Sequence, residues 1–141
     1  MYTLPDQEVR KRILEEAKTI AVVGLSENPE RPSHMIAEAL QQNGYRVIPV
    51  NPVLTKPVLG EQPYASLKDL PEPVDIVDVF RRSEHTPEIA KEAVEIKAKV
   101  LWLQEGVYNE DAYKYAKEHG LTVIMDHCIK VDHALLIGKR S

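Results

Sequence analysis

The chain has 141 residues, of which 43% are hydrophobic and 28% are charged, and its formal net charge is −4. This size and composition predict one globular domain over residues 1–141 and argue against intrinsic disorder. The acidic balance argues against a broad surface for nucleic acid, and the single cysteine, Cys128, excludes an internal disulfide and a cysteine-rich zinc site.

Neither a secretory signal nor a membrane-spanning segment is indicated by the sequence. The first residues are too rich in charge for a signal peptide, and no apolar run approaches the roughly 20 residues that a spanning helix needs. We therefore expect a cytoplasmic protein that binds a small molecule, with no nucleic-acid or membrane partner. No feature of the sequence indicates a protein partner.

The chain begins with a helical pattern and then a strand. Residues 3–18 predict a helix, with Thr3 and Asp6 as a capping box, that packs on the sheet or across its edge. Residues 20–23 form a short, β-branched apolar run, which is typical of a buried parallel strand.

A second helix and a second strand follow a polar loop. Ser33 is the expected N-cap of this helix, and Asn43 with Gly44 ends it, because glycine tolerates the left-handed backbone at a helix end. Residues 45–50 then predict a strand.

The middle of the chain is irregular and leads into a third strand. Prolines interrupt residues 53–73, which predict only a short strand and one helical turn. Residues 74–80 predict a strand in which Asp75 and Asp78 break the apolar run, so we expect one end or face of it to meet solvent.

The second half of the chain repeats the alternation of helix and strand. Thr86 is the expected N-cap of a helix, and residues 99–103 predict the fourth strand. Asn109 caps the next helix, and residues 121–125 predict the fifth strand. Apolar positions at helical spacing then recur over residues 127–137.

This order of elements predicts an α/β fold with a parallel sheet of about five strands and helices on both faces. Ligands of such sheets bind outside the carboxyl ends of the strands. Those ends are residues 24–33, 51–56, 80–85, 104–108 and 126–128, so the candidate site is expected there.

The polar loop over residues 24–33 has the features of an anion site. The N-terminus of the following helix favours negative charge. Arg31 adds a planar donor fork that suits phosphate, and Ser26 and Ser33 add hydroxyl groups. The alternative is an ordinary loop in which Ser33 only caps the helix and Arg31 is only solvated.

Two common nucleotide motifs are missing. The NAD fingerprint needs three spaced glycines and an acid near the end of the second strand, but only Gly24 is present and that strand ends at Val50, Asn51 and Pro52. With Lys56 nearby, this end would suit a phosphorylated ribose better than a free one. No ATP-binding P-loop occurs either.

Four stretches of the chain resemble a known family. They are Gly24-x-Ser26-x-Asn28-Pro29-x-Arg31-x-Ser33, Gly44-Tyr45-x-Val47-x-Pro49-Val50-Asn51-Pro52, Val74-Asp75-Ile76-Val77-Asp78-Val79-Phe80-Arg81 and Leu101-Trp102-Leu103-Gln104-x-Gly106-Val107. From about residue 19 to residue 128 the chain resembles the small stand-alone coenzyme A-binding protein family. That family is similar to the coenzyme A (CoA)-binding domain of the succinyl-CoA synthetase α subunit.

The resemblance implies a single Rossmann-like domain that binds CoA. It implies that the Gly24 loop with Arg31 and Ser33 faces the pyrophosphate, and that residues 50–52 and Lys56 lie near the adenosine 3′-phosphate. Phe80 and Arg81 would line the groove. Residues 104–106 stand where the synthetases carry a Thr-Glu-Gly turn.

Loop chemistry and resemblance together give one set of candidate cofactor-binding residues. The set is Gly24, Ser26, Arg31, Ser33, His34, Val50, Asn51, Pro52, Lys56, Phe80, Arg81, Gln104, Glu105 and Gly106. The chain has no counterpart of the second synthetase domain with its phosphorylated histidine. The resemblance therefore predicts binding of CoA and not its synthesis into an acyl-CoA.

Other polar residues have weaker functional interpretations. Cys128 could exchange with the thiol of the cofactor, but a small buried side chain is the commoner role. The histidines and aspartates over residues 126–133 lack the spacing of a zinc helix and are expected on the surface. Glu105 could act as an acid or base, or could only hold its turn. Trp102 is expected in the core or the groove wall.

The sequence therefore predicts non-catalytic binding of CoA or an acyl-CoA, with neither catalytic residues nor metal ligands. The alternatives are an NAD(P)-dependent oxidoreductase or another nucleotide-binding enzyme, and a regulatory protein whose ligand tunes the binding of a partner.

Overall fold

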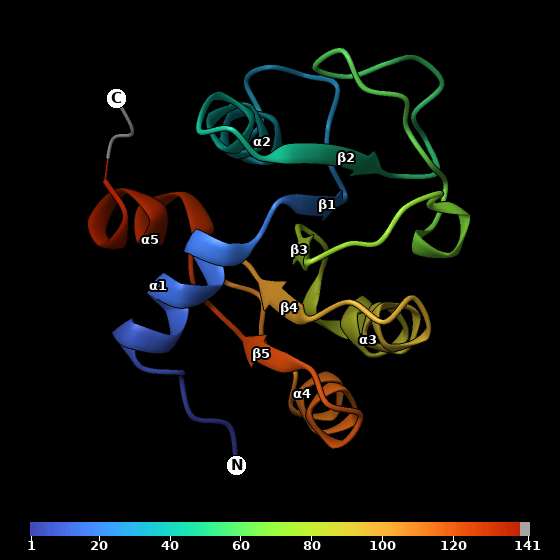
Figure 1. The fold of residues 1–141 in the computed structure, drawn as a ribbon. Helices are drawn as coiled ribbons and strands as arrows, with labels where there is room; N and C mark the ends of the chain where they lie inside the picture. Colours follow the sequence, from blue (N-terminus) through green and yellow to red (C-terminus); the bar gives the residue numbers. More distant parts are fainter. Residues whose placement is uncertain (139–141) are drawn as a thin grey trace.

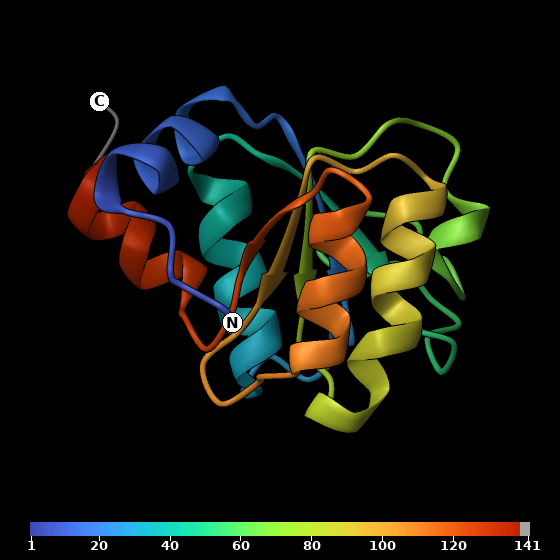
Figure 2. The same ribbon diagram turned by 90° about the horizontal axis from the view of Figure 1, so that it is seen from below.

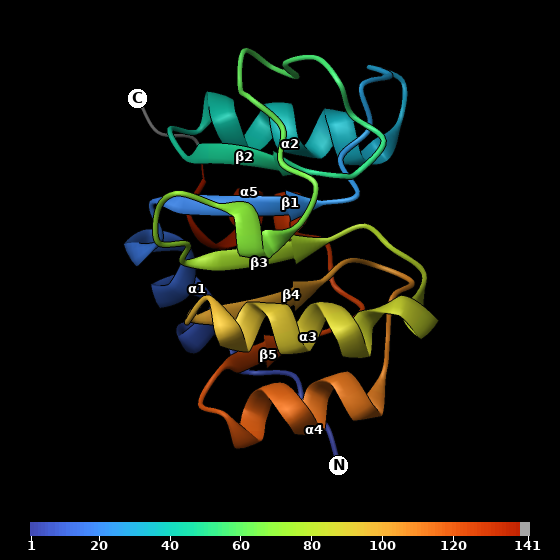
Figure 3. The same cartoon turned by 90° about the vertical axis from the view of Figure 1, so that its right-hand side faces the viewer.

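Five short apolar stretches form one parallel sheet, in which all strands point the same way (Figure 3). The computed structural model describes residues 1–138. The strands lie in the order β2-β1-β3-β4-β5. Their bounds are β1 Thr19–Val23, β2 Arg46–Val50, β3 Ile76–Val79, β4 Val100–Leu103 and β5 Thr122–Ile124.

Helices cover both faces of this sheet (Figure 1). Figure 2 shows α3 (Thr86–Glu95) and α4 (Glu110–Glu118) on one face, with α1 (Gln7–Glu16), α2 (Pro32–Gln42) and α5 (Ile129–Leu136) on the other. Short 3₁₀ helices, η1 (Leu67–Asp69) and η2 (Ser83–His85), lie in the connections around β3. The predicted α/β fold, a parallel sheet of five strands between helices, is confirmed.

Each face of the sheet has its own apolar layer, because successive side chains of a strand point to opposite faces. Ala21 and Val23 of β1 belong to the layer that contains the alanines of α3 and α4. Ile20 and Val22 belong to the layer with Leu14 of α1 and the apolar residues of α2 and α5. Within the described residues, no helix is both long enough and apolar enough to cross a membrane.

Three helix starts differ from the sequence prediction. α1 begins at Gln7 rather than near Thr3, because the Asp6 side chain accepts a backbone hydrogen bond of the first turn and caps the helix. Ser33 and Thr86 lie inside their helices and do not cap them. Their hydroxyl groups bond to the preceding loops instead.

The expectation that the third strand meets solvent at one end or face, marked by Asp75 and Asp78, is wrong for Asp78. This side chain is fully buried, and its Oδ1 accepts a hydrogen bond of 2.6 Å from Nε2 of Gln104. Its Oδ2 accepts none from residues 1–138. Burial raises the pKa of the Asp78 carboxyl from 3.8 to about 7, and the hydrogen bond from Gln104 opposes this only in part.

A buried charged cluster joins the first and last helices, where surface residues were expected. Nε of Arg10 in α1 lies 2.9 Å from Oδ2 of Asp132 in α5, and both side chains are buried. Oδ1 of Asp132 lies 2.9 Å from Nε2 of His127. Sequence patterns do not reveal this cluster, because its members come from opposite ends of the chain.

Replacing Asp132 by alanine should lower the free energy of unfolding by about 3–5 kcal/mol, because the buried Arg10 guanidinium would lose its carboxylate. Urea unfolding at neutral pH measures this. The matched control is Glu72→Ala, which breaks the partly exposed ion pair with Arg46 and should cost less than about 1 kcal/mol. Equal losses in the two variants would contradict the prediction.

Asp78 should make the protein less stable as pH rises. The folded state holds a proton on this carboxyl between about pH 4 and pH 7, where the unfolded state has lost it. The contribution of Asp78 to the free energy of unfolding therefore falls by roughly 4 kcal/mol between about pH 4 and pH 7. Denaturant unfolding of the wild type and Asp78→Asn over this range should show the asparagine variant gaining relative stability as pH rises. Parallel curves would show that Asp78 has an ordinary pKa.

Candidate functional site

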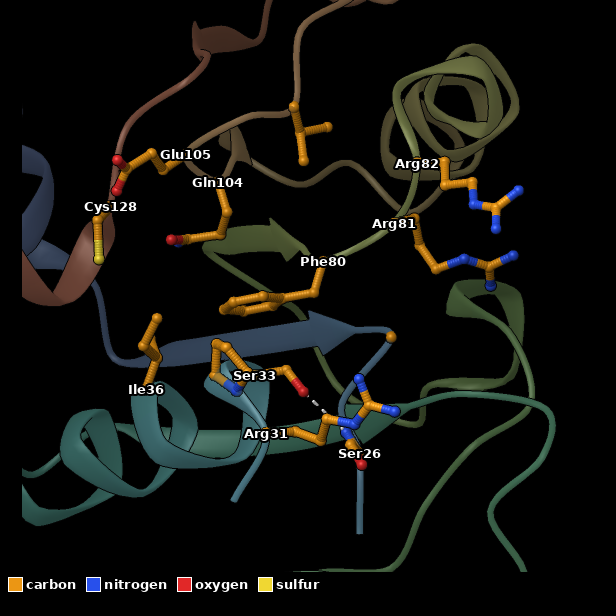
Figure 4. Close-up of a pocket in the computed structure, with 13 residues that line it drawn as sticks. Ser26, Arg31, Ser33, Ile36, Phe80, Arg81, Arg82, Gln104, Glu105 and Cys128 are labelled. Atoms are coloured by element: carbon orange, nitrogen blue, oxygen red, sulfur yellow. Dashed lines mark hydrogen bonds between the residues drawn. The ribbon is translucent and has the colours of Figure 1, made fainter. Parts of the chain in front are cut away.

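A cavity of about 700 Å³ lies over the carboxyl ends of β1, β3 and β4 and beside the first residues of α2 and α5 (Figure 4). This is the edge of the sheet at which the topology predicts a ligand site. The residues that line it are Gly24, Ser26, Arg31, Pro32, Ser33, Ile36, Phe80, Arg81, Arg82, Gln104, Glu105, Val107 and Cys128.

Most of the predicted site residues meet at this cavity. Those that line it are Gly24, Ser26, Arg31, Ser33, Phe80, Arg81, Gln104 and Glu105. The ones outside its lining are His34, Val50, Asn51, Pro52, Lys56 and Gly106.

The lining also contains residues that the sequence prediction missed, namely Pro32, Ile36, Arg82, Val107 and Cys128. Four of them, all but Ile36, lie in segments that the topology places at this edge of the sheet. Pro32 directly follows the loop after β1, Arg82 directly follows Arg81, Val107 follows the turn after β4, and Cys128 follows β5. The signal for these four was therefore present in the order of the elements.

Gly24 allows the loop after β1 to pass close to β3. Its φ is +88°, and a Cβ atom built there would lie 2.4 Å from the carbonyl oxygen of Phe80. Its N–H still donates to the carbonyl oxygen of Val50 in β2 at 2.8 Å. A side chain at this position would therefore strain the backbone and collide with β3.

Three polar side chains form hydrogen bonds to the backbone of the loop after β1. The Ser26 N–H donates to Oγ of Ser33 at 3.0 Å (Figure 4). Nδ1 of His34 lies 2.9 Å from the Ser26 carbonyl oxygen, so this nitrogen donates. Nδ2 of Asn51 donates to the carbonyl oxygen of Leu25 at 3.1 Å. His34 and Asn51 therefore shape the loop without lining the cavity.

One end of the cavity is cationic. Arg31, Arg81 and Arg82 lie together there (Figure 4). Arg82 is 3.9 Å from a carboxylate oxygen of Glu84, and both side chains are exposed. Among the described residues, Arg31 and Arg81 form no ion pair. Arg31 is also the N-cap of α2 and makes no side-chain capping bond, so its guanidinium group can meet a ligand.

The opposite end combines apolar side chains with the Cys128 thiol and the Glu105 carboxylate. In Figure 4, Cys128 and Ile36 lie on the side away from the arginines, with Phe80 and Gln104 between the two ends. Phe80 and Cys128 are half-buried, whereas Gln104 is 3% exposed. The cavity therefore changes along its length from a cationic end to an end with apolar side chains, a thiol and one carboxylate.

The residues predicted near a 3′-phosphate lie beside this cavity. Val50 and Pro52 line a second hollow of about 350 Å³, which shares Arg81 with the first. Lys56 is exposed on the loop after β2 and lines neither hollow.

The turn after β4 is fixed by a backbone contact. The Gly106 N–H donates to Oδ1 of Asp126 at 2.7 Å, which ties this turn to the loop after β5. Glu105 is exposed and lines the cavity. Gly106 thus supports the turn, and Glu105 faces the ligand space.

The cavity offers groups for binding and few for bond cleavage. Its described lining contains no histidine that could activate Cys128 or a serine hydroxyl. Residues 1–138 contain no cluster of three side chains that could hold a metal ion. The arginines suit phosphate groups, and the apolar side chains at the other end suit an uncharged chain.

Comparison with known proteins shows which family the chain is similar to. The family described as CoA binding domain matches residues 18–134. The chain is 52% identical to the uncharacterized protein YneT of Bacillus subtilis, and the match covers 93% of this chain and 96% of that protein. It is 31% identical to acetate–CoA ligase (ADP-forming) II of Archaeoglobus fulgidus, and that match covers 86% of this chain but 19% of the ligase.

Solved structures confirm the fold. A hypothetical protein from Pyrococcus horikoshii OT3 has a TM-score of 0.92 and 37% sequence identity, and the match covers 98% of this chain and 99% of that one. The Rossmann-like fold that the resemblance implied is therefore observed both in this chain and in a relative of the same length. On the family match and the sequence identities, the chain belongs to the CoA binding domain family.

Proposed function

We propose that the protein binds CoA or an acyl-CoA in the cavity at the carboxyl ends of β1, β3 and β4 and performs no reaction on it. One observation carries the proposal. In a chain of the CoA binding domain family, the cavity has three arginines at one end, and Ile36 and Cys128 lie at the other end beside the exposed Glu105. The arginines match the charged phosphates of CoA, and the apolar side chains match its uncharged pantetheine arm.

The cationic end supports a role in holding the pyrophosphate. The N-terminus of α2 carries a partial positive charge and opens toward the cavity beside Arg31. Arg81 lies across from it after β3. The Ser33 hydroxyl accepts from Ser26, so its own proton stays available for a phosphate oxygen.

The remaining predicted residues support a place for the adenosine. Asn51 and Pro52, which directly follow β2, carry no carboxylate that would hold a free ribose. The hollow beside Val50 and Pro52 is also lined by Glu84, Glu88 and Glu92, so we place the 3′-phosphate on the side of Lys56. Lys56 is exposed on the adjacent loop, where its flexible ammonium group could reach a 3′-phosphate. An NAD site would need an acid at this position for the ribose hydroxyl groups.

The non-catalytic part of the proposal rests on the cavity's chemistry. Cys128 is its thiol, and no histidine in the described lining stands ready to activate it. The ligase of Archaeoglobus fulgidus matches this chain over only 19% of its length. Most of that enzyme therefore has no counterpart in the matched region.

Calorimetry with three ligands tests the function. We expect the protein to bind CoA, to bind dephospho-CoA more weakly because the contact to the 3′-phosphate is lost, and to show no measurable affinity for NAD. Equal affinity for CoA and dephospho-CoA would remove Lys56 from the site. Binding of NAD without binding of CoA would overturn the proposal in favour of an oxidoreductase.

Arg31→Ala should weaken CoA binding by about 1.5–3 kcal/mol, because a hydrogen bond between charged groups is lost. The matched control is Arg46→Ala. Arg46 is also an exposed arginine, but it lies at the opposite end of β2 and pairs with Glu61 and Glu72. The control should leave the dissociation constant unchanged. An unchanged constant in Arg31→Ala would place Arg31 outside the phosphate contact.

A further inference from the structure

Gln104 and Asp78 form a buried pair beneath the cavity. Asp78 is fully buried and Gln104 is 3% exposed, so the hydrogen bond of 2.6 Å between them is shielded from water. Asp78 does not line the cavity, whereas Gln104 does. Ligand contact at this point is therefore made by Gln104, with Asp78 behind it.

The hydrogen bond decides which end of the amide points toward Asp78. Above about pH 7 Asp78 is a carboxylate, which only accepts hydrogen bonds, so Gln104 turns its NH₂ group toward it. In the structure Nε2 is the atom that makes this bond. The carbonyl oxygen of the same planar amide then points away from Asp78.

The carbonyl oxygen of Gln104 is left without a partner in residues 1–138, since Nε2 makes the one side-chain hydrogen bond of this residue. Oδ2 of Asp78 also lacks a partner among the described residues, but it is buried and Asp78 does not line the cavity. Figure 4 shows the Gln104 side chain extending beside Phe80, on the way from the arginines to Cys128. A ligand that runs along the cavity passes this oxygen.

We propose that Asp78 is a positioning residue that locks the Gln104 carbonyl oxygen toward the cavity, where it accepts a hydrogen bond from an amide N–H of the ligand's pantetheine arm. The inference rests on the proposed function, and it adds that this part of the site selects a ligand with a donor. An amide N–H fits better than the terminal thiol, because S–H is a weak donor.

Two substitutions at Asp78 separate positioning from packing. Asp78→Asn keeps an acceptor for Nε2 but adds a donor, so Gln104 can still present its carbonyl oxygen and CoA affinity should fall less than in Asp78→Leu. Asp78→Leu has a similar branched shape without an acceptor. Gln104 then turns its NH₂ group to the cavity, and CoA binds about 3- to 10-fold more weakly, the size of one net hydrogen bond.

A double-mutant cycle tests whether Asp78 acts through Gln104. Gln104→Met removes the acceptor at similar length and should weaken CoA binding by the same about 3- to 10-fold. Asp78→Leu combined with Gln104→Met should bind no more weakly than Gln104→Met alone, because the two changes remove one interaction.

The measurement is calorimetry at pH 8 with CoA and with adenosine 3′,5′-bisphosphate, which lacks the pantetheine arm. All variants should bind the bisphosphate as the wild type does. Additive losses in the double variant, wild-type affinity for CoA in Gln104→Met, or equal losses for both ligands would overturn the inference. These outcomes leave the proposed function intact, whereas a wild type that binds neither ligand overturns both.

Discussion

The close approach of the backbone at Gly24 is the constraint on which the site depends. β1 lies between β2 and β3, and the helices that follow β1 and β3 lie on opposite faces of the sheet. The connections that leave β1 and β3 therefore separate at this point and leave a crevice between them. Gly24 stays bonded to Val50 while its Cα faces the Phe80 carbonyl oxygen, where no Cβ would fit. The loop that carries Arg31 and Ser33 can therefore start close to the sheet and lean over the ends of the strands.

Hydrogen bonds with three polar side chains hold the loop after β1 in place. Ser33 and His34 belong to α2, and Asn51 follows β2, yet all three bond to backbone groups of residues 25 and 26. The loop is thus fixed through its backbone, and its own side chains remain available to a ligand. This division of roles explains why His34 and Asn51, which the sequence placed in the site, support the cavity from outside its lining.

Much of the fold could be predicted because its strands are short apolar runs in a regular alternation with amphipathic helices. The loops at the carboxyl ends followed from that order. Gly24 and Arg31 followed from the chemistry of the first loop, whereas Arg81 and Gln104 came from the resemblance to the CoA-binding family. Contacts between distant segments could not be predicted. Asp78 was expected to meet solvent because an acid in a strand usually does, but its register neighbours Val22 in β1 and Trp102 in β4 belong to a layer that helices cover. Asp132 was expected on the surface because its partner Arg10 lies at the other end of the chain. Cys128 was noted as a thiol, but its place in the cavity depends on how α5 packs.

Three aspartates of the fold differ in how completely their carboxyl groups are hydrogen-bonded. Asp132 has a partner on each oxygen, and Asp75 accepts two backbone N–H groups at the amino end of β3. Asp78 lies at the other end of the same strand, fully buried, with one oxygen unpartnered among the described residues. A leucine or valine there would serve packing better, since an incompletely bonded buried carboxyl costs free energy. Local conflicts of this kind concentrate at functional sites. The conflict here lies directly beneath the cavity and bonds to a residue that lines it, so the cost is explained by what Asp78 does to Gln104 and not by the fold of β3.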